Sequence, residues 1–139
     1  MAVILVLTFV AAVASAPGGG DESVRRFMAA FNAQDADAMA ELVTPGVDWV
    51  TLDGSELRVE VSGRDALRTS MVDYFKSCPS CRSTLVSVSA TATRVTTVET
   101  ASWSTRTGER REQQAIAVYE FDGPLITRVI YFPSEPVGD

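Results

Sequence analysis

Helical and strand periodicity are separated along the chain, and this separation is the strongest constraint on its fold. Near the start, four apolar residues recur at the spacing of one helix face: Val24, Phe27, Met28 and Phe31. Later segments rich in β-branched and aromatic residues predict four strands, over residues 83–92, 94–106, 112–122 and 125–132. Successive strands with short turns favour an antiparallel meander, and the helices that precede them cover one of its faces.

Two more helices and a strand pair complete the expected order. Asp35 is placed to cap a short second helix that Pro45-Gly46 ends, and a third helix starts at Gly63-Arg64-Asp65. Residues 47–52 and 57–61 predict two strands joined by a turn at Asp53-Gly54. We therefore predict an α+β domain over residues 22–133, with three helices on a curved, mostly antiparallel sheet that forms a cone. Residues 134–139 are expected to be a tail.

The first residues resemble a targeting segment. Residues 2–16 are apolar except for Thr8 and Ser15, a run too short to cross a bilayer with margin. Small residues at its end match the A-x-A pattern of a cleavage site. We interpret residues 1–16 as a signal peptide and residues 17–21 as a flexible exit, which predicts a secreted or periplasmic protein with no membrane segment after processing. A hydrophobic first helix of the domain is the alternative.

Charge and composition exclude several classes of partner. The chain has 18 acidic and 12 basic residues and a net charge of -6, which argues against binding to nucleic acid. It has no histidine, so the commonest metal ligand is missing and we predict no metal site. No phosphate-binding loop or other cofactor motif occurs, so we predict no cofactor. Catalysis, if any, must use carboxylates, tyrosines or cysteines.

The chain's two cysteines stand three positions apart, at Cys78 and Cys81. In an exported protein such a pair predicts one intramolecular disulfide. A thiol-disulfide protein is the alternative function, but the activated cysteine of such proteins lies at a helix N-terminus. Here the pair follows the third helix.

Several segments resemble a known family. Residues 27–39 read Phe-Met-Ala-Ala-Phe-Asn-Ala-Gln-Asp-Ala-Asp-Ala-Met, the helix start at residues 63–67 reads Gly-Arg-Asp-Ala-Leu, and the closing hairpin at residues 122–128 reads Asp-Gly-Pro-Leu-Ile-Thr-Arg. In this order they resemble the nuclear transport factor 2-like superfamily, including its SnoaL-like branch, from Ser23 to Pro133. The resemblance implies a cystatin-like α+β barrel whose cone holds a small apolar molecule.

The same resemblance implies a homodimer formed through the outer face of the sheet. In the segment 125–132, odd-numbered and even-numbered positions alike carry apolar residues. Both faces of this strand are therefore expected to be covered. The superfamily contains isomerases, cyclases, dehydratases and epoxide hydrolases beside members with no known reaction, so the fold does not give the function. An exported small-ligand-binding domain is our first expectation, and an isomerase or cyclase of the same fold is the alternative.

The residues expected to line the cone are mostly aromatic: Phe27, Trp49, Thr51, Tyr74, Trp103, Tyr119 and Tyr131. Steroid isomerases of this fold pair a general-base Asp with an oxyanion hole made by a Tyr and a protonated Asp. By the resemblance, the Tyr position is Phe27 and the base position falls near Thr51. That constellation is therefore displaced here, and a histidine-dependent cyclase arrangement is impossible.

The candidate catalytic groups are Asp53, Glu99 and Tyr119. Asp53 precedes Gly54 in a turn, where Asp is favoured for backbone hydrogen bonding, and its functional role would be a base at the pocket mouth. Glu99 shares a strand face with Trp103 and is expected to face the cavity. We favour its neutralisation by an arginine (Arg128, Arg94 or Arg64); the alternative is a protonated carboxyl that donates a hydrogen bond. Tyr119 is the candidate electrophilic donor.

Overall fold

The structure is a computed structural model that describes residues 19–137 of the chain. The predicted signal peptide lies outside the described residues. Three helices are described: α1 (Gly19–Asn32), α2 (Ala36–Glu41) and α3 (Arg64–Ser77). The strands are β1 (Val43–Asp53), β2 (Glu56–Ser62), β3 (Arg82–Ala90), β4 (Arg94–Ser104), β5 (Arg110–Asp122), β6 (Leu125–Tyr131) and β7 (Glu135–Pro136).

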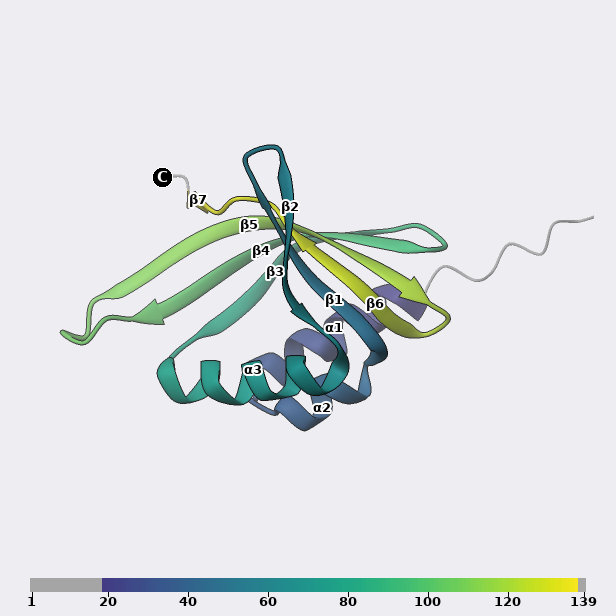
Figure 1. Cartoon of the computed structure of the whole chain (residues 1–139). Helices are drawn as coiled ribbons and strands as arrows, with labels where there is room; N and C mark the ends of the chain where they lie inside the picture. Colours follow the sequence, from purple (N-terminus) through teal and green to yellow (C-terminus); the bar gives the residue numbers. More distant parts are fainter. Residues whose placement is uncertain (1–18, 138–139) are drawn as a thin grey trace, which may run out of the picture.

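One curved sheet contains all the strands, in the order β2-β1-β6-β5-β4-β3, with β7 paired to β5. The pairing is antiparallel except between β1 and β6, which run parallel. All three helices lie on one side of the sheet (Figure 1). The α+β class, the three helices and the mostly antiparallel curved sheet are thus confirmed. The sheet is not a closed barrel, because β2 and β3 remain as its two edges.

The core between helices and sheet follows the sequence patterns. Val24 and Phe27 of α1 are 0% and 1% exposed and pack against inward-facing residues of the sheet such as Val129. The Asp35 side chain accepts a hydrogen bond of 2.9 Å from the Ala38 backbone N–H, so Asp35 caps α2 as predicted.

Three parts of the chain differ from the sequence-based expectation. Within the expected tail, Glu135 and Pro136 form β7, which pairs with β5. Helix α1 begins at Gly19, so residues 19–21 are not part of a flexible exit. The reason is a close approach to the sheet, since a Cβ at Gly20 would lie 3.0 Å from Val95 Cγ2 and 3.4 Å from the Phe121 ring. Pro45-Gly46 does not end a helix but lies within β1, where the pairing with β6 is irregular between Val43 and Asp48.

The connection from α3 to β3 contains the cysteine pair. The Cys78 and Cys81 sulfurs lie at disulfide-bonding distance, and their Cα atoms are 5.4 Å apart. Asn32 at the end of α1 exchanges two hydrogen bonds of 2.8 Å with the backbone of Ser83. Gln34 donates a hydrogen bond of 3.0 Å to the Pro79 carbonyl oxygen. The start of β3 is therefore fixed to α1 as well as to α3.

A bulge interrupts β3. Leu85 pairs with Glu99 and Ser87 pairs with Val98, so Val86 is an extra residue without a partner on β4. Leu85 and Val88 both pack against the core, whereas Val86 is 57% exposed. The bulge thus keeps the inward-facing side chains of β3 in phase with those of β4.

Part of the outer face of the sheet is also apolar. Val50 and Ile130 are paired neighbours on the face opposite to Val129, and Val118 pairs with Ile130. Further along, Ile116 and Phe132 are 48% and 40% exposed. A contiguous apolar face of this kind is typical of a surface that another protein covers.

We propose that two copies of the chain associate through this outer face. Wild type should sediment as a dimer, and Ile116→Glu should be monomeric, because a charge at the centre of an apolar contact opposes its desolvation. Analytical ultracentrifugation measures both. Ala29→Glu, on the exposed side of α1, is the control and should remain dimeric. A monomeric wild type at all concentrations would contradict the proposal.

Candidate functional site

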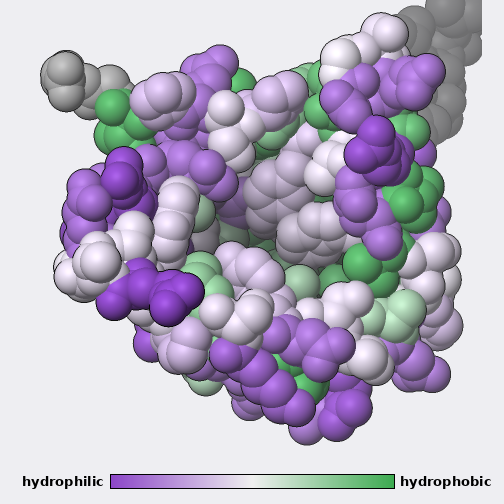
Figure 2. Space-filling view, turned by 60° about the vertical axis from the view of Figure 1, so that its left-hand side comes forward, coloured by the Kyte–Doolittle hydropathy of each residue, from purple (hydrophilic) through white to green (hydrophobic). Residues whose placement is uncertain are grey.

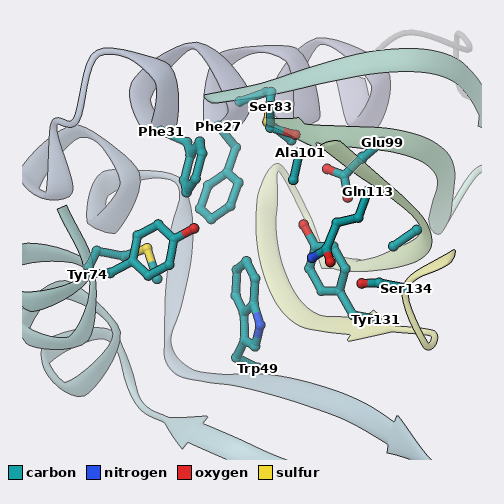
Figure 3. Close-up of a pocket in the computed structure, with 13 residues that line it drawn as sticks. Phe27, Phe31, Trp49, Tyr74, Ser83, Glu99, Ala101, Gln113, Tyr131 and Ser134 are labelled. Atoms are coloured by element: carbon teal, nitrogen blue, oxygen red, sulfur yellow. The ribbon is translucent and has the colours of Figure 1, made fainter. Parts of the chain in front are cut away.

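A pocket of about 310 Å³ lies between the helices and the inner face of the sheet. The space-filling view looks into a deep hollow in the surface (Figure 2). The pocket has an apolar part and a polar part, formed by different elements. In Figure 3, Phe27, Phe31 and Tyr74 lie across the cavity from Glu99, Gln113 and Ser134.

Aromatic and thioether side chains form the apolar part. Phe27 extends from the buried stripe of α1, and its ring centroid lies 6.1 Å from that of Trp49. Phe31, one turn further along α1, packs against Tyr74 of α3 at 5.8 Å. Trp49 on β1 stacks on Tyr131 of β6, with centroids 5.1 Å apart and an interplanar angle of 21°. These contacts hold the rings in place, so the apolar walls are preformed.

Glu99 is the central polar group. Strand alternation on β4 points Val95, Thr97 and Glu99 inward, and Glu99 is only 4% exposed. The Tyr119 hydroxyl donates a hydrogen bond of 2.8 Å to Glu99 Oε1 and lies 3.1 Å from the Tyr131 hydroxyl. Glu99 Oε2 has no hydrogen-bond partner among the described residues. Glu99 is one of the residues that line the pocket, and its unpartnered Oε2 is buried in the pocket wall.

Burial affects the pKa of Glu99 and of the tyrosines around it. Desolvation raises the pKa of Glu99, and the hydrogen bond from Tyr119 offsets part of the increase. Desolvation also raises the pKa of Tyr119 and of Tyr131 well above the ordinary value, so both phenols stay neutral. When Glu99 is protonated, its proton belongs on Oε2, since Oε1 already accepts from Tyr119. The carboxyl then presents a donor to the pocket.

The expectation that an arginine neutralises Glu99 is wrong. Arg94 and Arg128 form ion pairs with Glu120 instead. Arg94 and Arg128 are the cross-strand partners of Glu120 on either side of it, so the three share one face of the sheet, and Arg94 and Glu99 lie on opposite faces of β4. Arg64 donates to the Val43 carbonyl oxygen. The structure is therefore consistent with the alternative, a carboxyl held by tyrosines and shifted toward its neutral form.

The other candidate base, Asp53, lies outside the pocket. It forms an ion pair of 2.7 Å with Arg58 in the β1–β2 hairpin, where both side chains are more than half exposed. Asp53 is the last residue of β1 before the turn, its side chain pairs with Arg58, and it is not among the residues that line the pocket. Thr51 also lies outside this pocket. Its hydroxyl donates a hydrogen bond to Glu60, and its side chain lines a separate, more open groove nearby.

Four of the seven expected lining residues border the pocket: Phe27, Trp49, Tyr74 and Tyr131. Tyr119 is fully buried and lies behind Glu99, where it positions the carboxyl. Trp103 lies on the same strand face as Glu99 and Ala101 but beyond the residues that line the pocket.

Sequence reasoning missed several lining residues, among them Gln113, Ser83 and Ser134. Gln113 lies an even number of residues from Tyr119 on β5, so the two side chains are on the same face of the strand. Once Tyr119 is placed inward, Gln113 is therefore expected to face inward as well. Ser83 becomes a neighbour only through its pairing with Ala101, and Ser134 follows the last long strand. Whether these two serines line the pocket depends on the register between strands and on the course of the chain after β6. Neither can be predicted from the periodicity of the sequence.

Within residues 19–137, no group of three or more Asp, Glu, His or Cys side chains is arranged to hold a metal ion. Over the same range, no helix has the length and apolarity needed to cross a membrane. The polar side chains that line the pocket carry carboxyl, amide and hydroxyl groups.

Comparison with known proteins identifies the class of this fold and site. The model of the SnoaL-like domain family matches residues 24–129, and the chain belongs to that family. Its superfamily is the nuclear transport factor 2-like superfamily, as the sequence resemblance implied. No curated protein matches the chain.

Solved structures agree with this assignment of the fold. An uncharacterized cystatin-fold protein from Novosphingobium aromaticivorans has a TM-score of 0.70 and 22% identity, with 81% of this chain and 96% of that chain covered. A protein assigned as a SnoaL-like polyketide cyclase from Jannaschia sp. CCS1 has a TM-score of 0.70 and 13% identity, covering 86% and 87%. A protein assigned as an isomerase from Bacillus subtilis has a TM-score of 0.67 and 21% identity, covering 85% and 87%. At these identities the likeness shows the fold.

The burial of Glu99 predicts a pH-dependent stability difference. Its raised native pKa means that Glu99 contributes stability below the ordinary value of 4.5, and that this contribution is lost as the pH rises through the native pKa. Glu99→Gln has no such titration. The Tm of the variant minus that of wild type should therefore increase as the pH rises above 4.5, as measured by circular dichroism melts.

Glu56→Gln removes a carboxylate from an exposed strand position and serves as the control. A difference curve for Glu99→Gln that does not change with pH, or that matches the curve for Glu56→Gln, would show that burial does not shift Glu99.

Proposed function

We propose that the protein binds a small, mostly apolar molecule that carries one hydrogen-bonding group, and that this group contacts Glu99 Oε2. The observation that carries the proposal is a carboxyl group that is 4% exposed, belongs to the lining of a preformed pocket and has one oxygen without a partner among the described residues. A buried polar atom without a partner is costly, so a ligand that supplies the missing hydrogen bond gains affinity and specificity.

The dimensions and chemistry of the pocket support this class of ligand. A volume of about 310 Å³ is at the lower end of the range typical of small-molecule sites, about 300–1,000 Å³. Phe27, Phe31 and Trp49 offer flat apolar surfaces, and no arginine or lysine lines the pocket among the described residues. With Glu99 in its neutral form, the preferred partner group is an acceptor such as a carbonyl oxygen.

The first test uses phenylnaphthylamine, a neutral dye whose fluorescence increases in apolar surroundings. Wild type should bind about one dye per chain. Ala101→Phe should weaken binding by about tenfold or more, because Ala101 lines the pocket and the larger ring fills it. Fluorescence titration gives both dissociation constants.

Thr100→Phe is the matched control, since Thr100 is the adjacent residue and points to the opposite face of β4. It should bind the dye as wild type does. Equal binding by wild type and Ala101→Phe would place the dye elsewhere and refute the pocket as a binding site.

A second candidate function is proton transfer on a bound carbonyl compound. It is favoured by the same free oxygen, because a buried carboxylate with a raised pKa is a stronger base once ionised. Glu99 Oε2 would take a proton from the carbon beside the carbonyl and return it at another carbon. The Tyr74 hydroxyl points into the cavity and would donate to the carbonyl oxygen (Figure 3). The cyclase and isomerase assignments of structural neighbours are compatible with this chemistry.

The test is the conversion of a β,γ-unsaturated cyclic ketone to its conjugated isomer, followed by ultraviolet absorbance. If the candidate holds, Glu99→Gln should lower the rate by about 100-fold or more, since the amide cannot accept the proton. Asp53→Asn is the control and should have no effect, because Asp53 lies outside the pocket. A rate that Glu99→Gln leaves unchanged would exclude Glu99 as the proton carrier and leave ligand binding as the function.

Export of the protein stays a prediction from the sequence. It is supported by the apolar run in residues 2–16 and by the cysteine pair, and the intact mass of the mature chain tests it.

A further inference from the structure

The inner face of the sheet continues beyond the pocket. On β4 and β5 the inward-facing residues form cross-strand pairs in a fixed order, Glu99 with Ala115 and then Ala101 with Gln113. These four residues line the pocket. The next pair in the same row is Trp103 with Arg111, which strand alternation places on the same face. Paired side chains of this kind have Cβ atoms about 4.5–5.5 Å apart.

The exposure of this row shows where the pocket opens. On β5 the inward-facing residues change from buried Tyr119 and Ala117, through partly buried Ala115, to exposed Gln113 and Arg111. The pocket therefore opens toward the tip of the β4–β5 hairpin, which extends past the helices (Figure 1). Trp103 and Arg111 lie at this opening.

Neither residue has a structural role that accounts for its type. Trp103 is a large aromatic residue that stays partly exposed and belongs to no part of the core cluster. Arg111 forms an ion pair of 3.1 Å with Glu109, and these side chains are 56% and 60% exposed. A pair so exposed contributes little to stability, so the guanidinium can exchange Glu109 for another anion at small cost.

The neighbouring arginine differs in its position. Arg110 points to the opposite face of β5, where it pairs with Glu112. Along this row, the apolar pocket is therefore followed by a cross-strand pair that consists of an aromatic ring, Trp103, and a planar cation, Arg111. Guanidinium groups bind carboxylate, sulfonate and phosphate groups through paired N–H donors.

We propose that Trp103 and Arg111 form an outer subsite, which binds an anionic group attached to the apolar body of the bound molecule. This inference rests on the proposed ligand-binding function of the pocket. The ligand class is thus an amphiphilic organic anion: a ring system sits between α1 and the sheet, Trp103 contacts its edge, and Arg111 binds its charge.

Two dyes that share one ring system test the subsite. Anilinonaphthalene sulfonate and phenylnaphthylamine differ only by the sulfonate group. Arg111→Gln should raise the dissociation constant of the sulfonate dye by about 3- to 10-fold and leave that of the neutral dye unchanged. Arg110→Gln, with the same change in charge on the other face, should leave both unchanged. Trp103→Leu should weaken both dyes by a similar factor, because its contact is with the shared rings.

Salt provides a second readout. Added sodium chloride should weaken binding of the sulfonate dye to wild type more than to Arg111→Gln, since screening acts on the removed interaction. If Arg111→Gln and Arg110→Gln behave alike toward both dyes, the subsite is refuted while the pocket stands. If Ala101→Phe fails to weaken the neutral dye, or neither dye binds, the pocket itself is refuted and the subsite with it.

Discussion

The hydrogen bond from Tyr119 to Glu99 makes a carboxyl tolerable inside this sheet. A carboxyl that is nearly inaccessible to water loses its hydration, and no arginine compensates the charge. The phenol satisfies one oxygen, while burial moves the group toward its neutral form. The Tyr131 hydroxyl adjoins the phenol, and the Tyr131 ring stacks on Trp49. One polar contact in the core is thus linked to the aromatic wall of the pocket.

This linkage explains why the aromatic walls of the pocket and its polar interior are held together. Tyr131 belongs to the hydrogen-bonded group and to the apolar surface, so rotation of its ring would break a stack and a hydrogen bond together. The hydrogen bonds of Tyr119 and Tyr131 favour one arrangement of these side chains, because rotation of either ring would lose them. Preorganisation of that kind lowers the cost of ordering a site when a molecule binds.

The sequence predicted the element order well because the two periodicities scarcely overlap. The stripe of α1, the cap at Asp35 and the hairpin turn at Asp53-Gly54 each have a local cause, and the structure places each of them as expected. The start of α1 could not be predicted in the same way. Gly20 suggests flexibility in isolation, and only its contact with Val95 and Phe121, far along the chain, shows that it permits close packing.

Prediction of the site succeeded where strand parity was enough and failed where partners had to be assigned. Alternation placed Glu99 inward, and the aromatic residues expected to line the cone include Tyr131, which borders the pocket. It did not reveal that Arg94 and Arg128 share the outer face with Glu120, because that requires the register of three strands. Asp53 was ambiguous for the opposite reason, since a turn aspartate and a pocket base have the same local sequence.

The extra residue in β3 has a consequence for the open edge of the sheet. An unclosed sheet leaves rows of backbone donors and acceptors that a strand from another molecule can extend. At Val86 the row is broken and the strand bends, so a straight foreign strand cannot continue its hydrogen bonds past that point. Val86 therefore has two effects. As the extra residue of the bulge, it lets both Leu85 and Val88 face the core, and it makes the β3 edge of the sheet a poor template for strand addition by another molecule.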